Sequence, residues 1–331
     1  MNGAAIFGLL GTSLSSDEKR FFQDYDPWGF ILFARNLEQP DQIRALTASL
    51  RECVGRDCPI LIDQEGGRVQ RLRAPDFIEW LPPLDQMAKV SPVDARQAMS
   101  VRYRLIAHEL RDLGIDVNCA PMLDIPIETT HEIITNRCYG HDVDAVSEMG
   151  RAVAEGLLSG GVLPIIKHIP GHGRGNVDSH LELPVVETSI EKLSRQDFEP
   201  FRRLSDLPMA MTAHVVYRTI DAENPATTSS DIIDLIRSDF GFDGLLMTDD
   251  LSMKALSGDF ASRTQASLAA GCDIILHCNG EMDEMQAIAN ASGALSENAQ
   301  KRADAALQMR HDPEPFDAKW AKERLVELGA L

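Results

Sequence analysis

Eight short apolar runs recur along the chain, and each is followed by loop residues and then by a helical pattern. The runs are Ala4–Leu9, Gly29–Phe33, Ile60–Ile62, Ile115–Cys119, Leu163–Ile166, Met209–Thr212, Leu245–Thr248 and Ile274–Leu276. Several are continuous rather than alternating, which is typical of strands buried on both faces. Strands that alternate with helices predict a parallel α/β sheet, and right-handed crossovers would curl eight such units into a closed (β/α)8 barrel. An open doubly wound sheet is the competing architecture.

The length of the chain fits one barrel. Such barrels commonly take about 250 residues and more with insertions, so 331 residues leave room for extended βα loops. The chain has no long linker of Gly, Ser or Pro and no internal repeat. We therefore predict a single TIM-barrel domain over residues 1–331.

Several helix ends carry local signals. Residues 15–18, Ser-Ser-Asp-Glu, form a capping box that predicts a helix start. Ser91 before Pro92 predicts a cap and a proline at the first helical position, and Gly114 predicts the left-handed end of that helix. A break at Pro313-Glu-Pro315 predicts a short terminal helix after it.

Composition excludes several classes of protein. The formal net charge of −19 argues against a nucleic-acid binder, which usually carries a basic face, and against docking on an anionic membrane. The six cysteines form no C-x-x-C pair, which indicates reduced core thiols. The N-terminus shows neither a signal peptide nor a membrane span. We expect a cytoplasmic protein; the sequence does not reveal its oligomeric state, and a monomer is favoured.

Polar residues that are suited to catalysis or ligand binding stand just after five of the apolar runs. They are Asp63, Asp124, Lys167 with His168, His214 and Asp249. In a parallel barrel these positions are the carboxyl ends of strands, where active sites form. Their common placement supports the barrel and predicts one shared site.

The loop after the fifth run is the richest in chemistry. Residues 167–180 hold three of the nine histidines within thirteen positions: His168, His172 and His180. Asp178 and His180 are separated by one residue, so in an extended segment they share a face, and the carboxylate can raise the basicity of the imidazole. A histidine that titrates near neutrality can protonate a leaving group and later deprotonate water.

Zinc binding is an alternative for this loop, because imidazoles and a carboxylate are suitable ligands. His168 and His172 are separated by a stretch containing Pro170 and Gly171, so they cannot share one helical face as in helix-borne metal motifs. We favour proton transfer and expect no metal.

Asp249 directly follows the seventh run and is itself followed by Asp250. Consecutive residues on a strand point to opposite faces, so at most one of the two acids can easily face the barrel mouth. The alternative is an acidic helix N-cap, which we favour for Asp250 or Ser252. For Asp249 we favour a nucleophile.

Further residues are typical of a polar substrate site. Asp63-Gln-Glu-Gly-Gly-Arg-Val-Gln-Arg71 follows the third run, and its paired glycines would let the backbone approach a ligand closely. Arg137 and Lys167 would complete a local basic cluster for an anionic or polyhydroxylated substrate. His214 is expected to line the pocket, although a core histidine bonded to backbone is an almost equal alternative.

Together these segments resemble glycoside hydrolase family 3, and within it the bacterial β-N-acetylglucosaminidases (β-hexosaminidases) of peptidoglycan recycling. The matching segments, which cover most of the chain, are Asp63–Arg71, Asn136-Arg137, Lys167–Gly173, Asp178–His180, Met211–His214 and Thr248–Met253. Two departures are Cys138-Tyr139, where Ser-Phe is more usual, and Arg174-Gly-Asn-Val177 in a variable part of the loop. Arg174 is expected to affect what binds beyond the terminal sugar.

The resemblance implies roles for these residues. It implies that Asp249 is the nucleophile, that His180 is the general acid/base and that Asp178 is its partner. The residues implied to hold the terminal sugar are Asp63, Arg71, Arg137, Lys167 and His168.

The resemblance also implies a substrate, namely terminal N-acetylglucosamine β-linked to an anhydro-muramyl sugar in muropeptide fragments. Cleavage would retain the anomeric configuration and need no cofactor. Three other functions stay open: a phosphorylase, a metal-dependent hydrolase and a non-catalytic sugar-binding barrel.

Overall fold

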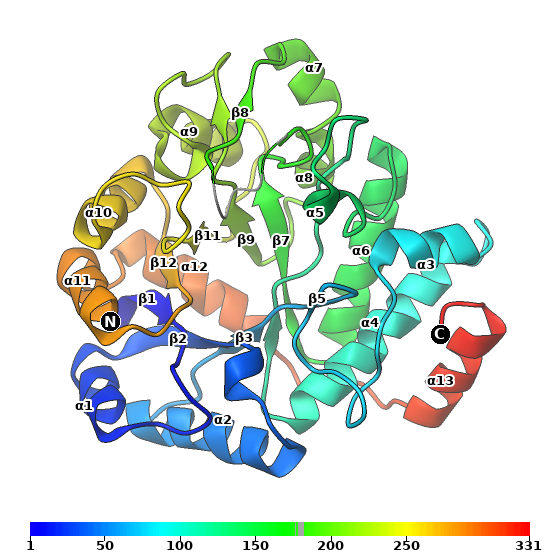
Figure 1. Ribbon diagram of the computed structural model, residues 1–331, viewed down its shortest axis with the longest axis horizontal. Helices are drawn as coiled ribbons and strands as arrows, with labels where there is room; N and C mark the ends of the chain where they lie inside the picture. Colours follow the sequence, from blue (N-terminus) through cyan, green and yellow to red (C-terminus); the bar gives the residue numbers. More distant parts are fainter. Residues whose placement is uncertain (176, 178–181) are drawn as a thin grey trace.

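The computed structural model describes residues 1–175, 177 and 182–331, and its centre is a closed barrel of eight parallel strands (Figure 1). In their order around the barrel, the strands are β1 (Gly3–Phe7), β12 (Ile274–His277), β11 (Leu245–Asp250), β9 (Met209–Thr212), β7 (Leu163–Ile169), β6 (Val117–Asn118), β3 (Ile60–Ile62) and β2 (Pro27–Leu32). Each contains or overlaps one of the eight apolar runs, so the predicted (β/α)8 barrel is confirmed.

Helices surround the barrel, as Figure 1 shows. The α-helices are α1 (Ser16–Tyr25), α2 (Pro40–Val54), α3 (Pro83–Lys89), α4 (Ala95–Asp112), α5 (Glu132–Thr135), α6 (Val143–Ser159), α7 (Ile190–Arg195), α8 (Glu199–Arg203), α9 (Ser230–Ser238), α10 (Phe260–Ala270), α11 (Met282–Ser292), α12 (Glu297–Gln308) and α13 (Ala318–Glu327). Two 3₁₀ turns, η1 (Ala34–Asn36) and η2 (Ala226–Thr228), complete them. Helix α13 follows the predicted break and packs against α4.

Burial on both faces explains why the strands are continuous apolar runs. Leu245 and Met247 belong to the cluster inside the barrel, whereas Leu246 between them packs outward with α9 residues such as Ile232. Neighbouring side chains on a strand point to opposite faces, and here both faces are apolar. None of the described helices is long and apolar enough to cross a membrane.

The helix signals had mixed outcomes. The capping box is confirmed, because the Glu18 amide donates to Ser15 Oγ at 3.1 Å and the Ser15 amide donates to the Glu18 carboxylate at 2.8 Å. Gly114 adopts the left-handed conformation (φ 76°) at the end of α4, as predicted. The predicted start of that helix is wrong: α4 begins at Ala95, whose side chain is buried, whereas Val93 is 88% exposed. The core contact, rather than the Ser-Pro pair, therefore sets where the helix starts.

Two small sheets extend from the carboxyl ends of the barrel strands. Strands β4 (Gln64–Gly66) and β5 (Val69–Gln70) form an antiparallel hairpin, and β8 (Val185–Val186) pairs in parallel with β10 (Val216–Tyr217). That residues 1–331 form a single domain stays a prediction.

Candidate active site

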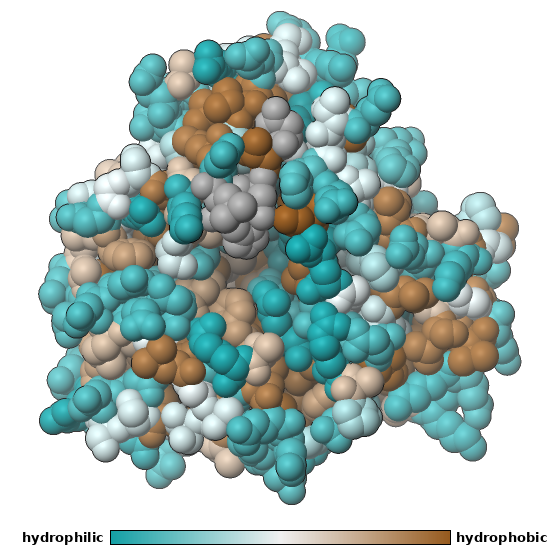
Figure 2. All heavy atoms as spheres, viewed as in Figure 1, coloured by the Kyte–Doolittle hydropathy of each residue, from teal (hydrophilic) through white to brown (hydrophobic). Residues whose placement is uncertain are grey.

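A pocket of about 140 Å³ opens where the barrel strands end. Figure 2 shows a hollow near the centre of this face. The polar residues that line the pocket among those described are Asp63, Arg71, His131, Arg137, Lys167, His168, His172, Asp249 and Asp250. They come from segments far apart in the sequence, so the barrel brings them together.

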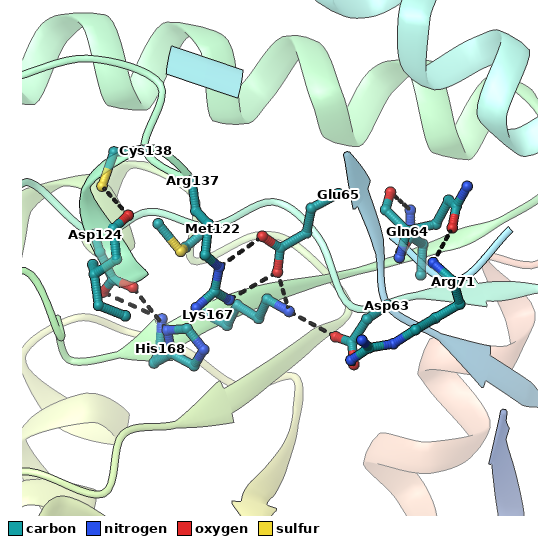
Figure 3. Close-up of polar contacts among 12 residues, drawn as sticks. Asp63, Gln64, Glu65, Arg71, Met122, Asp124, Arg137, Cys138, Lys167 and His168 are labelled. Carbon is teal, nitrogen blue, oxygen red and sulfur yellow. Dashed lines mark hydrogen bonds and ion pairs between the residues drawn. The ribbon is translucent and has the colours of Figure 1, made fainter. Parts of the chain in front are cut away.

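Five charged side chains of the described residues lie side by side at the pocket and are called the polar wall: Asp63, Glu65, Arg71, Arg137 and Lys167. Asp63 and Lys167 form its centre (Figure 3). Asp63 follows β3, and its carboxylate contacts Lys167 Nζ at 2.9 Å and Arg71 Nη2 at 3.0 Å. Burial alone would raise the pKa of Asp63, but the two cations outweigh it and hold the pKa well below its usual range. Burial alone would lower the pKa of Lys167, but the Asp63 and Glu65 carboxylates outweigh burial and raise this pKa above its ordinary value. The Asp63 carboxylate and the Lys167 ammonium are therefore both charged at neutral pH.

Glu65 was not assigned a role from the sequence, yet it joins the two sides of this wall. Its side chain is 1% exposed, and its two oxygens each lie 2.9 Å from the Arg137 guanidinium. One of them also lies 2.6 Å from Lys167 Nζ. Burial raises its pKa, but Arg137 and Lys167 together lower the pKa of Glu65 to about 2. The bidentate geometry fixes the plane of the Arg137 guanidinium.

The cations of this wall are thus each paired with a carboxylate. A wall of alternating, fixed donors and acceptors suits the hydroxyl groups of a sugar, which both donate and accept. An anionic ligand would have to compete with Asp63 and Glu65 for the same cations. Of the two substrate classes expected from the sequence, the geometry favours the polyhydroxylated one.

His168 is oriented by Asp124, which follows β6. The Asp124 carboxylate accepts from His168 Nδ1 at 2.7 Å and from the His172 amide at 2.5 Å. Burial raises the pKa of Asp124, but His168 outweighs it and leaves the pKa lowered. An imidazole that donates through Nδ1 keeps its other nitrogen for a ligand, and a buried carboxylate fixes that arrangement.

His172 is buried beside His168, with the ring centroids 5.6 Å apart in an edge-to-face arrangement. Among the described residues, neither of its ring nitrogens has a hydrogen-bond partner. Burial, and then the neighbouring His168, lowers the pKa of His172 to about 4, so the ring is neutral at pH 7. Within residues 1–175, 177 and 182–331, no three His, Cys, Asp or Glu side chains are grouped as metal ligands.

Asp249 lies near the end of β11 and lines the pocket. Its carboxylate accepts from the Asp250 amide at 2.8 Å. The Asp250 carboxylate has a different task, because it accepts from the amides of Ser252 at 3.0 Å and Cys278 at 3.1 Å. The predicted helix N-cap at Asp250 or Ser252 is wrong, since α10 begins only at Phe260. The bonds from Asp250 instead hold the end of β11 against β12.

His214 has a different position from the one expected. The ring is buried, with Nδ1 2.7 Å from Thr227 Oγ1 and Nε2 3.0 Å from the Asp250 carbonyl. It is absent from the described residues that line the pocket. Burial lowers the pKa of His214, which suits a neutral imidazole that braces the strand end behind Asp249.

The paired glycines also serve a purpose other than the expected approach to a ligand. Gly66 has φ 112°, and a Cβ there would lie 1.9 Å from Arg102 Nη2. A Cβ on Gly67 would lie 2.7 Å from Pro82. The glycines let the hairpin pack closely on Arg102 and Pro82. Gln64 secures the other strand, because its Oε1 accepts from the amide of Arg71 at 2.9 Å.

Two residues of the predicted set, Asp178 and His180, lie outside the described residues. One pocket residue that the sequence did not suggest is His131, whose Nδ1 accepts from the Ile133 amide at 3.2 Å as the cap of α5. A histidine at the start of a four-residue helix gives no recognisable pattern, so only the fold reveals it.

Comparisons with known proteins show which family the chain belongs to. Residues 7–309 match the model of the glycosyl hydrolase family 3 N terminal domain. The chain belongs to this family. A β-hexosaminidase of Bordetella parapertussis is 37% identical over 284 residues, covering 84% of this chain and 80% of the relative. A β-hexosaminidase of Pseudomonas aeruginosa is 35% identical over 292 residues, covering 87% of this chain and 86% of the relative.

Solved structures agree. NagZ from Neisseria gonorrhoeae, in complex with N-trifluoroacetyl-D-glucosamine, has a TM-score of 0.88 and 29% identity, with 99% of this chain and 98% of that chain covered. A family 3 β-N-acetylglucosaminidase from Paenibacillus sp. FPU-7 has a TM-score of 0.88 and 30% identity, with 98% of this chain and 67% of that chain covered. The protein is a glycoside hydrolase of the β-N-acetylhexosaminidase type.

Proposed function

We propose that this enzyme removes terminal non-reducing N-acetylglucosamine from glycosides with retention of configuration. The observation that carries the proposal is that Asp249 opens onto the same pocket as the ion-paired wall of Asp63, Lys167 and Arg137. A carboxylate beside an array suited to sugar hydroxyls is what attack on an anomeric carbon requires.

In the proposed first step, an Asp249 oxygen forms a bond to the anomeric carbon while the glycosidic C–O bond breaks. The departing oxygen takes a proton from His180. In the second step, water gives its proton to the same imidazole and its oxygen bonds to the anomeric carbon, which releases Asp249. Asp178 is proposed to orient His180.

Most retaining glycosidases use two carboxylates for these tasks, so a histidine needs a physical reason. Once His180 has given its proton to the departing oxygen it is a neutral imidazole, which, unlike a carboxylate, does not repel the negative charge of the nucleophile. Nor does it repel carboxylates on the leaving group, which a muramyl sugar or its peptide would carry. The scheme requires no cofactor.

The proposed natural substrate is a muropeptide fragment in which N-acetylglucosamine is β-linked to an anhydro-muramyl sugar, which places the enzyme in peptidoglycan recycling. The β-hexosaminidase relatives and the glucosamine-derived ligand of the Neisseria structure support the sugar. A place in the cytoplasm is part of the proposal. All six cysteines are free, as is usual where thiols are kept reduced.

The test follows an aryl β-N-acetylglucosaminide and a muropeptide with the wild type, Asp249→Ala and His180→Ala. We expect near-complete loss in Asp249→Ala, and in His180→Ala a smaller loss on the aryl substrate than on the muropeptide. The β-anomer should appear first by NMR. Unchanged turnover in Asp249→Ala, or first release of the α-anomer, would overturn the proposal.

Two related activities are separated by the products and by metal content. Sugar 1-phosphate as the main product in phosphate buffer would identify a phosphorylase. Two zinc-bound structures are among the similar proteins, NagZ from Neisseria gonorrhoeae and CbsA from Thermotoga neapolitana. Activity that a chelator abolishes and zinc restores would indicate a metal-dependent hydrolase instead.

A further inference from the structure

A buried ion pair stands at the start of the segment that carries Asp178 and His180. Arg174 Nε lies 2.9 Å from the Asp197 carboxylate, and the two side chains are only 8% and 3% exposed. Arg174 Nη2 also donates to Gln196 Oε1 at 2.8 Å. The pair joins the loop after β7 to the connection between α7 and α8. From the sequence, Arg174 was expected to affect what binds beyond the terminal sugar; in the structure its guanidinium is bound to Asp197 and Gln196.

The backbone beside Arg174 is fixed as closely. A Cβ on Gly173 would lie 1.9 Å from the Ile125 carbonyl oxygen, so this backbone packs directly on the loop after β6. The Gly175 carbonyl accepts from the His131 amide at 3.2 Å. On the other side of Arg174, a Cβ on Gly171 would lie 3.1 Å from the Asp197 carbonyl oxygen. Residues 171–175 are therefore held by two neighbouring loops.

The far end of the same segment is also held. The Pro184 carbonyl accepts from the Val216 amide at 2.9 Å, and β8 then pairs with β10. Asp178 and His180 thus belong to a stretch whose two ends, Gly175 and Pro184, are attached to the barrel. The position that a proton donor on this stretch can reach depends on where its ends are fixed.

The ion pair matters energetically because both charges are away from water. Burial raises the pKa of Asp197 above its ordinary value, and Arg174 opposes that rise. Without Arg174 the carboxylate would be buried with no cation beside it, which strongly destabilises a local structure. Arg174 does not line the pocket with Asp249, so any effect on the reaction acts through other residues.

We propose that Arg174, through Asp197, is a positioning residue for the acid/base His180. The inference rests on the proposed function, because it takes His180 as the group that protonates the leaving oxygen. Arg174 is absent from the described residues that line the pocket with Asp249, so the role proposed for it is positioning and not catalysis. Arg174 would act by fixing the start of the segment that carries His180. Its effect on the rate should therefore be larger for leaving groups that need more protonation.

The test compares kcat/KM on two glycosides of N-acetylglucosamine, one with a strongly acidic dinitrophenol as leaving group and one with a second sugar. General acid catalysis contributes roughly 10²–10⁴-fold, so we expect Arg174→Ala to lose at least about 10²-fold on the disaccharide. On the dinitrophenyl glycoside, which needs no proton, the loss should stay below about threefold. In the double variant with His180→Ala, the two effects should not add.

The control is Arg237→Ala, which breaks a partly buried ion pair with Asp273 (2.6 Å; side chains 15% and 5% exposed) near the start of β11, away from the pocket, and leaves Asp273 its second partner, Arg302, at 2.9 Å. It should lower stability but act equally on both substrates. If Arg174→Ala does not fold, Arg174→Lys and Asp197→Asn carry the same test.

The outcomes separate the two proposals. If His180→Ala itself shows no dependence on the leaving group, the acid/base assignment fails and the positioning role fails with it. If His180→Ala shows that dependence but the Arg174 variants lose nothing, or lose equally on both substrates, only the positioning role is refuted. Additive losses in the double variant would also refute it.

Discussion

Glu65→Gln tests whether the charges of the polar wall depend on one another. The Glu65 carboxylate is buried against Arg137 and Lys167, and removing one partner of a buried pair costs about 3–5 kcal/mol. Glutamine keeps one acceptor oxygen, so we expect the lower end, about 3 kcal/mol. With an unfolding entropy of about 2.1 cal/mol/K per residue, 331 residues give about 0.7 kcal/mol/K, so Tm should fall by about 4 °C.

The same substitution should weaken sugar binding, because Arg137 and Lys167 lose the carboxylate that fixes them. We expect kcat/KM on an aryl β-N-acetylglucosaminide to fall at least about tenfold, which corresponds to about 1.4 kcal/mol. The assay is thermal unfolding together with steady-state kinetics.

The matched control is Glu155→Gln, whose partner Arg96 is exposed like Glu155 itself (44% and 47%). An exposed pair contributes about 0–1 kcal/mol, so Tm should change by no more than about 1.5 °C. If Glu65→Gln and Glu155→Gln have the same Tm and the same kcat/KM, the argument that Glu65 fixes Arg137 and Lys167 is refuted.

Three further predictions concern stability. The pKa of His172 is about 4 in the folded protein, against an ordinary 6.5, so its contribution to the free energy of unfolding is fully present above pH 6.5 and is lost, by about 3 kcal/mol, as the pH falls towards 4. The variant His172→Gln should therefore show a smaller fall in unfolding free energy between pH 7 and 4.5. An unchanged slope would contradict this. In Gly66→Ala the new methyl group must displace Arg102, which should lower the free energy of unfolding by more than about 3 kcal/mol. In the control Gly55→Ala there is open space around the new methyl group, and the loss should be about 1 kcal/mol. Equal melting temperatures of the two variants would refute the packing argument. Lys167→Met removes the cation between the Asp63 and Glu65 carboxylates, so the variant should melt at a lower temperature than the wild type. This difference in Tm should shrink on acidification towards pH 4, because protonation relieves the repulsion between the two carboxylates. A difference that does not depend on pH would contradict the prediction.

The barrel was predictable because its physics is local and repeated. A strand that is buried on both faces must be a continuous apolar run, as in Leu163–Ile166, and the residue after it is then placed at the pocket face. The start of α4 was not predictable in the same way. Ser91 and Pro92 suit a helix start, but contacts with distant parts of the core decide that the helix begins at Ala95.

Parts of the site could not be derived from local patterns because their partners are far away in sequence. Glu65 pairs with Arg137 across 72 positions and with Lys167 across about a hundred, a pairing that the order of the barrel strands creates. His214 shows the same difficulty. The direction in which its ring points depends on Thr227 and on the Asp250 carbonyl. Neither partner can be inferred from the sequence of the strand that leads to His214.

The surroundings of Arg174 could not be read from its own loop. From the sequence, it was expected only to affect what binds beyond the terminal sugar. Whether it faces the ligand or the protein depends on the neighbouring loop, and here Asp197 and Gln196 bind it. Only the fold brings these residues next to Arg174.

The measurement that bears most directly on the mechanism is capture of the covalent intermediate. A fluorinated N-acetylglucosaminyl donor that forms the glycosyl-enzyme quickly and releases it slowly would be incubated with the enzyme, which is then digested and analysed by peptide mass spectrometry. We predict one added sugar on the peptide that contains Asp249, located on that side chain, and none in Asp249→Ala. A label on Asp250, or on any other carboxylate, would contradict the assignment of the nucleophile.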